Sequence, residues 1–141
     1  MAGMLYNELE VISMNRIIAA AIVKEGKTFI ARRNYGSLAG YWEFPGGKVE
    51  GNETDAECLK REIMEELSVK LKIEECLGEQ QFFVDRKEYM MVLYKAVLLD
   101  ENFRLSVHSE TAWVEKEQLH KYKLAPVDEL LVQQGCLEGL V

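Results

Sequence analysis

The order of the expected elements predicts an α+β fold, in the form of an α/β/α sandwich around a mixed β-sheet. Apolar runs near the start of the chain indicate paired strands. An amphipathic helix follows a Pro-Gly-Gly turn, and further strands lead to a second helix near the C-terminal end. No repeat or linker interrupts this order, and 141 residues fit one domain with one core.

The first expected elements are strands. An apolar run at Ile17–Val23 resumes at Thr28–Ala31 after a polar turn, which predicts a hairpin with a buried first strand. A short strand is expected at Tyr41–Phe44, and Pro45-Gly46-Gly47 should end it.

The clearest helix is expected at Thr54–Leu67. Thr54 and Glu57 have the spacing of a capping box, in which each side chain accepts a hydrogen bond from a free backbone N–H. Glu57 and Arg61 stand four residues apart, which suits an ion pair. The apolar face consists of Ala56, Leu59, Ile63 and Leu67.

The middle of the chain indicates further strands. Strand segments are expected at Val69–Ile73 and Gln81–Val84, followed by a turn at Asp85-Arg86-Lys87. Tyr89–Leu99 is the longest strand candidate, and its nearly continuous apolar character predicts burial on both faces.

The last segments are short, apart from a terminal helix. Trp113-Val114 should be extended, and Glu115–His120 should form one helical turn. Ala125-Pro126 should begin the terminal helix, with proline in its first turn. The residues expected to face inward are Leu130, Leu131 and Leu137.

The composition excludes several classes of protein. A formal charge of -7 argues against a nucleic-acid binder, which needs a basic surface, but permits a small anionic substrate where a metal ion offsets clustered carboxylates. Cys58, Cys76 and Cys136 are too scattered for a zinc site or disulfide framework, so a reducing cytoplasm is expected. No apolar run approaches the roughly 18 residues of a membrane span, so no membrane partner is expected.

The first thirteen residues are expected to lie outside the folded domain. They contain Glu8 and Glu10 and lack the basic start and apolar middle of a secretory signal. Met14 offers an alternative start. Residues 1–13 are therefore interpreted as an extension, native or added, and residues 14–141 as the folded domain.

Three carboxylates follow one stripe of the expected helix. At about 100° per residue, Glu62, Glu65 and Glu66 lie beside its apolar face. Taken alone, such a pattern is more often a solvated acidic surface. Oxygen ligands in a cluster also suit magnesium or manganese, shared with substrate phosphates and water. Gly46-Gly47 before the helix would let the backbone come close to such a site.

A longer pattern surrounds these carboxylates. Gly47 is followed after five residues by Glu53, and after seven more by the run Arg61-Glu62-Ile63-Met64-Glu65-Glu66-Leu67-Ser68-Val69. This resembles the Nudix box, G-x5-E-x7-R-E-U-x-E-E-x-G-U, where U is a bulky aliphatic residue. Every specified position matches except one, because Ser68 stands where the family has glycine. That glycine follows the helix, where a left-handed residue is often required.

The resemblance extends beyond the box. The run 43–50 (Glu-Phe-Pro-Gly-Gly-Lys-Val-Glu) resembles the lead-in of MutT-type nucleotide pyrophosphohydrolases. The run 30–33 resembles their strand that supplies an arginine near the nucleotide, and the run 124–128 resembles their base-reading segment. The resemblance implies the Nudix fold and a Nudix hydrolase acting on small nucleotides.

The family's reaction places water on a phosphorus of a nucleoside diphosphate joined to another group; triphosphates give a monophosphate and pyrophosphate. The resemblance implies that Glu62, Glu65 and Glu66 bind Mg²⁺, with Mn²⁺ as the alternative. It implies that the carbonyl of Gly46 completes the site.

The resemblance also gives Arg61 the task of orienting these carboxylates through a pairing with Glu53. A helix salt bridge from Arg61 to Glu57 is the simpler interpretation, and the two are compatible.

Further candidate site residues lie outside the box. The general base is either a box glutamate or Glu110, which otherwise is a plain loop glutamate; His108 is interpreted as a loop residue rather than a catalyst. Arg33, with Arg32 as the alternative, is a candidate for holding phosphate or sugar. Lys48 is a candidate for phosphate, against the simpler reading of a solvated lysine.

Substrate choice is expected to depend on Asp128. An ionised aspartate only accepts hydrogen bonds, which suits the amino group of cytosine or the N–H groups of an oxidised guanine. Tyr41 and Trp42 offer rings for stacking, with core or lid roles as equal alternatives. The resemblance favours the branch that hydrolyses CTP, dCTP and 5-substituted relatives, followed by the 8-oxo-dGTP sanitising branch.

Two other functions remain as alternatives. One is hydrolysis of ADP-ribose or another nucleoside diphosphate derivative. The other is a Nudix domain that binds a nucleotide without catalysis, although such domains usually lose box glutamates that this chain keeps. A monomer and a homodimer are both compatible with the sequence.

Overall fold

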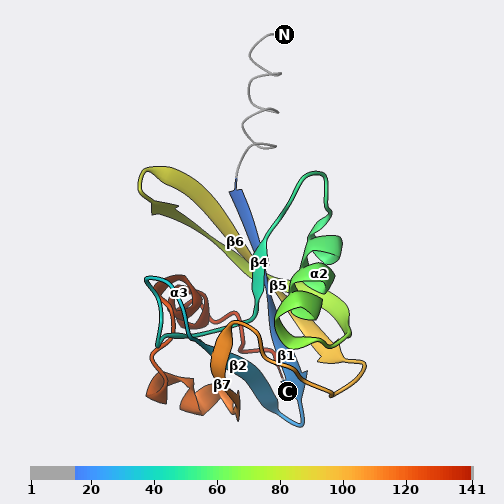
Figure 1. Ribbon diagram of the computed structural model, residues 1–141. Helices are drawn as coiled ribbons and strands as arrows, with labels where there is room; N and C mark the ends of the chain where they lie inside the picture. Colours follow the sequence, from blue (N-terminus) through green and yellow to red (C-terminus); the bar gives the residue numbers. More distant parts are fainter. Residues whose placement is uncertain (1–14, 141) are drawn as a thin grey trace.

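The computed structural model describes residues 15–140, in which a seven-stranded mixed sheet lies between helices (Figure 1). The expectations for an extension over residues 1–13 and a start at Met14 lie outside the described residues. Within residues 15–140, no helix is both long and apolar enough to span a bilayer.

Strand β1 is the centre of the sheet. It runs parallel to β6 on one side and antiparallel to the short β4 on the other, while its last residues pair with β2. The path is β3-β2-β1-β6-β5, with β4 joined to β1 and β7 to β2. The strands are β1 (Asn15–Lys24), β2 (Lys27–Arg33), β3 (Trp42–Glu43), β4 (Gly46–Lys48), β5 (Leu71–Val84), β6 (Lys87–Leu98) and β7 (His108–Val114).

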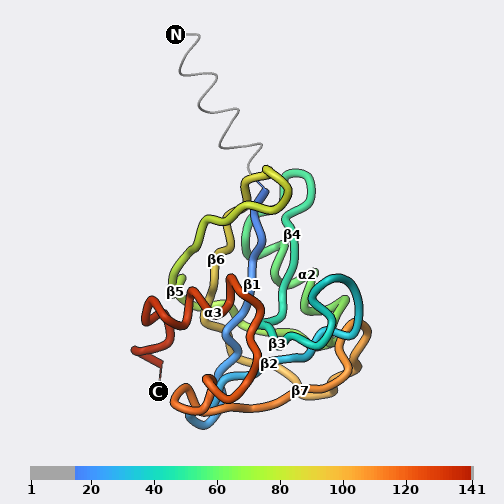
Figure 2. Tube along the Cα trace, turned by 90° about the vertical axis from the view of Figure 1, so that its left-hand side faces the viewer, coloured from blue at the N-terminus to red at the C-terminus, as the bar shows by residue number. Residues whose placement is uncertain are grey.

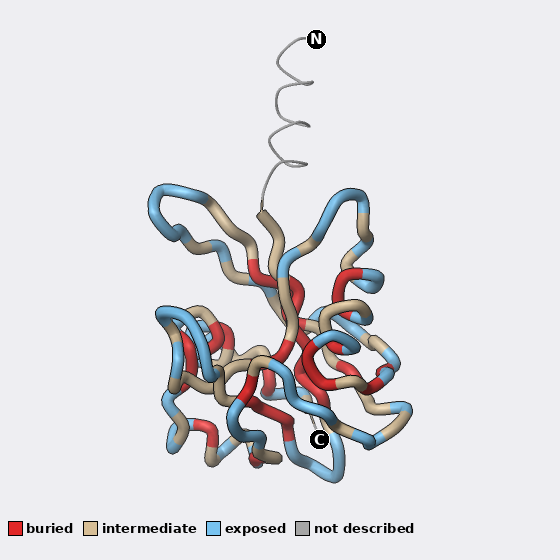
Figure 3. The backbone as a smooth tube through the Cα atoms, in the orientation of Figure 1, coloured by how far each residue is buried: buried red, intermediate tan, exposed pale blue. Residues whose placement is uncertain are grey.

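Both faces of β1 are buried, one under each of two helices. Successive side chains of a strand point to opposite faces. Ile18 and Ile22 therefore join the core beneath helix α2 (Asp55–Leu67), whereas Ala19 joins the core beneath α3 (Pro126–Gln133). Figures 1 and 2 show the two helices on opposite sides of β1, and Figure 3 shows the buried residues along it. The predicted α+β sandwich is confirmed.

Two tight turns connect neighbouring antiparallel strands. Glu25 and Gly26 both have positive φ between β1 and β2, and Asp85 and Arg86 do so between β5 and β6. Two left-handed residues in succession match the twist of a two-residue hairpin. The predicted first hairpin and the predicted turn at residues 85–87 are both confirmed.

Helix α2 begins with the predicted capping box. Thr54 Oγ1 accepts a hydrogen bond from the Glu57 amide at 3.1 Å, and Glu57 Oε1 accepts one from the Thr54 amide at 2.9 Å. Because the Glu57 carboxylate is engaged in this cap, the predicted ion pair with Arg61 is wrong. The ion pairs that Arg61 forms in the described structure go to other glutamates.

The longest strand is β5, with 14 residues against 12 for β6, so the expectation that Tyr89–Leu99 is the longest was wrong. The sequence indicated only the two ends of β5. Its polar middle is also extended, because an edge strand can expose one face to water. Register shifts between Ile73 and Cys76 and between Cys76 and Gly78 interrupt the alternation of side chains that a sequence pattern relies on.

The C-terminal region follows the prediction with one exception. Lys116–Lys121 forms a short 3-10 helix, and Pro126 begins α3. Leu131 and Leu137 are buried, but Leu130 is 42% exposed, so its predicted inward orientation was wrong. Neighbouring helical positions differ by about 100°, and the buried stripe of α3 passes through Asp128 and Leu131 instead.

The end of α2 gives a stability prediction. Ser68 has φ 58° and ψ 32°, which confirms the left-handed conformation expected at this position. A side chain in that region costs roughly 1–2 kcal/mol, part of which glycine loses again through the entropy of the unfolded chain. We expect Ser68→Gly to raise the free energy of unfolding by about 1 kcal/mol in urea titrations.

Ser68→Ala is the matched control, because alanine keeps the Cβ that causes the strain. It should give no gain. If Ser68→Gly is no more stable than Ser68→Ala, the explanation by left-handed strain is incorrect.

Candidate active site

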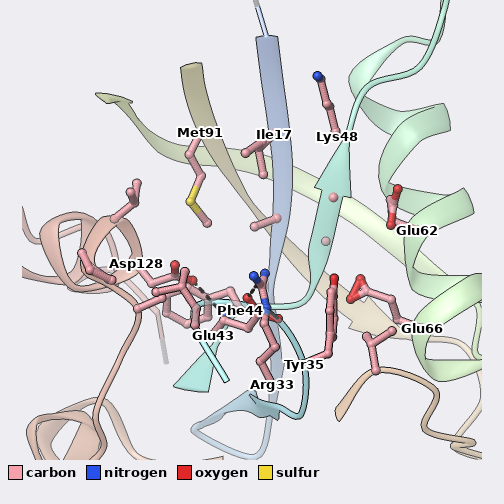
Figure 4. Close-up of a pocket in the computed structure, with 18 of the residues that line it drawn as sticks. Ile17, Arg33, Tyr35, Glu43, Phe44, Lys48, Glu62, Glu66, Met91 and Asp128 are labelled. Atoms are coloured by element: carbon pink, nitrogen blue, oxygen red, sulfur yellow. Dashed lines mark hydrogen bonds and ion pairs between the residues drawn. The ribbon is translucent and has the colours of Figure 1, made fainter. Parts of the chain in front are cut away.

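A cavity of about 530 Å³ opens between α2 and α3 (Figure 4). Residues of β1, β4 and β6 line it between the two helices, among them Ile17, Gly47 and Met91. Its two ends differ in chemistry. The α2 end is acidic, whereas Phe44, Val127 and other apolar groups surround the α3 end.

The acidic wall consists of the three glutamates predicted to share one stripe of the helix. Glu62, Glu65 and Glu66 all line the cavity. Their positions i, i+3 and i+4 place them on one face of α2. Leu59 and Ile63 hold the adjacent face in the core, so the stripe borders the cavity, with Glu66 buried and the Glu65 side chain 59% exposed.

Arg61 joins the stripe to the loop before the helix. Its Nε and Nη2 donate to the two carboxylate oxygens of Glu53 at 2.6 and 2.9 Å, which is a bidentate pair. Nη1 donates to Glu62 Oε1 at 2.8 Å and lies 3.3 Å from Glu65 Oε2. The hydrogen bonds from Arg61 and from the Glu50 amide lower the pKa of Glu53 to about 2. Glu53 thus balances the charge of Arg61 and holds it against the stripe.

Two glycines let the backbone approach this wall. Gly46 and Gly47 pair with Ala19 and Ile18 of β1. A Cβ on Gly47 would lie 2.2 Å from the carboxylate carbon of Glu62, and one on Gly46 would lie 2.0 Å from the carbonyl oxygen of Ile18. Any other residue at either position would displace the strand or the glutamate.

Glu66 is the most buried carboxylate of the stripe. Burial raises its pKa to about 8, and the charges of Glu43 and Glu62 add to the effect, while a backbone hydrogen bond from Gly46 opposes it. A carboxylate held among others in this way is stabilised by a nearby cation. The three glutamates and the backbone carbonyl of Gly46 offer hard oxygen donors, so the residues present fit a divalent ion of the Mg²⁺ or Mn²⁺ type.

Glu66 of the acidic wall also belongs to a cluster with Glu43 and His108. His108 Nε2 is 3.0 Å from Glu43 Oε2 and 3.9 Å from Glu66 Oε1. One ligand atom from each of the three side chains lies within 4.8 Å of the others. The interpretation of His108 as a loop residue was wrong, because it begins β7 and its side chain is fully buried. Sequence reasoning also passed over Glu43 as a site residue.

The other candidate residues are divided between the cavity and the surface. Arg33 and Lys48 line the cavity, whereas Arg32 and Glu110 are not among its lining residues. Arg33 donates to Glu43 through Nη2 at 2.7 Å and Nε at 3.3 Å. The half-exposed carboxylate of Glu110 pairs with Arg32 at 2.8 Å on the neighbouring strand.

Asp128 lies at the end of the cavity opposite the acidic wall (Figure 4). It is buried, and one carboxylate oxygen accepts a hydrogen bond from the Phe44 amide at 2.9 Å. Burial raises its pKa to about 7, against the effect of that hydrogen bond. Asp128 is therefore a polar group in an apolar part of the cavity, which suits it to orienting a ligand.

The aromatic rings at this cavity differ from those considered in the sequence. Trp42 packs edge-on against Tyr122 with ring centroids 5.1 Å apart in the α3 core, and Lys123 lies over the Tyr41 ring. Of the roles that the sequence left open for Trp42, the structure therefore shows packing in the core. The rings that line the cavity belong to Tyr35, Phe44 and Phe82.

Comparison with known proteins gives consistent results. The NUDIX domain family matches residues 14–135. A protein of Escherichia coli strain K12 named CTP pyrophosphohydrolase is 31% identical over 121 residues, covering 85% of this chain and 90% of that protein. A Mycobacterium tuberculosis protein named putative 8-oxo-dGTP diphosphatase 2 is 32% identical over 116 residues, covering 79% and 81%. The crystal structure of a MutT protein from Methanosarcina mazei Go1 superposes with a TM-score of 0.77 and 26% identity, covering 89% of this chain and 95% of that chain.

The glycine contact gives a prediction for metal binding. Gly47→Ala should push the Glu62 carboxylate out of place. We expect the affinity for Mn²⁺ to fall about tenfold or more, the loss that is typical when a metal ligand is no longer held in position. Electron paramagnetic resonance of Mn²⁺ titrated into the protein measures this directly.

Gly139→Ala is the control, since a Cβ there meets nothing within 4 Å. It should bind Mn²⁺ as the wild type does. Unchanged affinity in Gly47→Ala would show that Glu62 takes no part in the ion site.

The raised pKa of Asp128 gives a prediction for stability. The folded state keeps this proton up to about pH 7, while the ordinary value is 3.8. The folded state therefore binds more protons between these values, so stability falls as the pH rises from 4 to 7 and then levels off. Relative to Asp128→Asn, the wild type should lose on the order of 4 kcal/mol over this window.

The measurement is urea unfolding of both proteins in EDTA at a series of pH values. Asparagine keeps an oxygen that can accept from the Phe44 amide, so only the titration is removed. A difference between the two proteins that stays constant from pH 4 to 7 would mean that Asp128 is ionised in the folded state.

Proposed function

The chain belongs to the Nudix hydrolase family, and on this premise we propose that it hydrolyses a nucleoside triphosphate to a monophosphate and pyrophosphate with the help of Mg²⁺. The match over residues 14–135 covers nearly the whole described structure. The two relatives described above are named as enzymes that act on nucleoside triphosphates.

The observation that carries the proposal is the polarity of the cavity. Carboxylates that suit a divalent cation line one end, and apolar groups with the buried carboxyl of Asp128 line the other. A nucleoside triphosphate has the same two-part character, with an anionic chain and a flat base. Its phosphates would lie beside Glu62 and Glu66, and its base would lie between α3 and β6.

The residues of the acidic end have distinct tasks in this proposal. Glu62, Glu65, Glu66 and the Gly46 carbonyl hold the cation, which when bound neutralises phosphate charge and favours ionisation of the attacking water. Arg61 orients Glu62 and Glu65 through its bidentate pair with Glu53.

Arg33 and Lys48 supply positive charge for the phosphates from β2 and β4. The general base is best sought among the α2 glutamates, because Glu110 pairs with Arg32 outside the cavity. A base must lie within hydrogen-bonding reach of the water that it activates, directly or through one further water.

The end of the cavity that contains Asp128 supports cytosine as the preferred nucleobase. An ionised Asp128 accepts a hydrogen bond from the amino group of cytosine, and a protonated one can also donate. The similarity to a CTP pyrophosphohydrolase supports CTP, dCTP or their 5-substituted relatives. The similarity to a protein named as an 8-oxo-dGTP diphosphatase makes that nucleotide the second candidate.

The test is a substrate panel with magnesium: CTP, dCTP, 5-methyl-dCTP, dGTP, 8-oxo-dGTP and ADP-ribose. Release of pyrophosphate and monophosphate is measured for each. We expect one cytosine triphosphate to be turned over best, and a Glu65→Gln/Glu66→Gln variant to lose at least about a thousandfold in kcat.

Matched controls separate chemistry from surface charge. Glu75→Gln removes an exposed glutamate from β5 and should retain full activity, and Glu129→Gln does the same next to Asp128 on α3. Turnover of ADP-ribose alone would replace the proposed substrate with a nucleoside diphosphate sugar. Nucleotide binding without any turnover would leave a binding domain.

A further inference from the structure

The Glu43 side chain on β3 accepts hydrogen bonds from residues of two other strands beside the cavity. Its Oε2 atom lies 3.3 Å from Arg33 Nε and 3.0 Å from His108 Nε2, and its Oε1 atom accepts from Arg33 Nη2 at 2.7 Å. The sheet register brings them together, because Arg33 of β2 is the Cα partner of His108 of β7, and Ala31 of β2 is the partner of Glu43. In Figure 4 the Arg33 and Glu43 side chains meet between the acidic wall and Asp128.

The hydrogen-bonding capacity of His108 defines its role. A carboxylate of Glu43 that already accepts from Arg33 can only accept again, so His108 Nε2 must carry the proton and donate it. His108 Nδ1 is buried and, among the described residues, has no partner, which fits a bare lone pair better than an N–H. The Glu66 carboxylate lies 3.9 Å away, too far for a hydrogen bond.

We propose that His108 is a positioning residue, which fixes the Glu43 carboxylate so that Glu43 holds the Arg33 guanidinium at the cavity for a substrate phosphate. The proposal rests on the proposed function for the identity of the ligand. It assigns to His108 and Glu43 a task that neither the glutamate stripe nor the two glycines of β4 perform.

The geometry explains why Arg33 needs such support. The side chain of arginine is long and its rotamer freedom is large, so a guanidinium that waits for phosphate must be held in advance. Glu43 engages it on the edge formed by Nε and Nη2. Nη1 remains free of that pair and can meet an anion. Burial of the imidazole keeps water from competing for the Glu43 oxygen.

The experiment compares two substitutions of His108 with similar volume. His108→Gln keeps an N–H donor near the Nε2 position, whereas His108→Met removes it. The dissociation constant for α,β-methylene-CTP, a non-hydrolysable analogue, is measured by calorimetry with magnesium. We expect a rise of about tenfold for His108→Met, the loss expected for a hydrogen bond to a charged group, and a change below about threefold for His108→Gln.

A double-mutant cycle tests whether His108 acts through Arg33. In an Arg33→Met background, His108→Met should change the dissociation constant by less than about twofold, because the group that His108 positions is absent. A further tenfold loss in that background would overturn the proposal. Equal losses in His108→Gln and His108→Met would also overturn it, because they indicate a packing role. His120→Met, on the exposed surface, is the control for the substitution itself.

A spectroscopic reading separates this inference from the proposed function. The NMR signal of the Arg33 Nε–H group reports its hydrogen bond to Glu43 in the ligand-free protein. It should shift in His108→Met and stay in place in His108→Gln. If it does not move in His108→Met, the positioning role is incorrect even for an active enzyme. A wild type that turns over no triphosphate, with the Arg33 signal as expected, would instead contradict the proposed function alone.

Discussion

Carboxylates held close together repel one another, and one wall of this cavity brings several of them into a partly buried space. Glu62, Glu65 and Glu66 share a stripe of α2, and Glu43 approaches from β3. The consequence is visible at Glu66, whose pKa is raised to about 8 by burial and by the neighbouring charges. An arrangement of this kind stores an unfavourable interaction that a divalent cation relieves. The remaining features of the site either create this crowding or limit it.

The scaffold creates the crowding through β1 and the two helices that cover it. Ile18 and Ile22 anchor α2 on one face, so the glutamate stripe is held at the cavity edge. Gly46 and Gly47 bring β4 against β1 and leave just enough room for Glu62. Two arginines limit the repulsion. Arg61, which is held by Glu53, pairs with Glu62 of the stripe, and Arg33 pairs with Glu43. Glu66, by contrast, has no arginine within ion-pairing distance among the described residues.

The local part of this structure could be predicted from the sequence. The capping box at Thr54, the left-handed Ser68, the first hairpin and the proline-initiated α3 all depend on residues close together in the chain. The same holds for the glutamate stripe, which needs only helical periodicity and a recognisable spacing.

Features that depend on long-range pairing could not be predicted. The polar middle of β5 is extended because it pairs with β6 at the edge of the sheet, and register shifts interrupt its alternation. His108 becomes a buried site residue because β7 aligns with β2, and that same alignment pairs Glu110 with Arg32 at the surface.

The central claim, that these carboxylates are held together for a cation, is tested most directly by the free energy of unfolding measured with and without magnesium. We predict that the free energy of unfolding of the wild type rises with magnesium concentration, as for any ligand of the folded state, and that Glu66→Gln loses most of this rise. Equal stability with and without magnesium, or an unchanged response in Glu66→Gln, would contradict the claim that these carboxylates are held together for a cation.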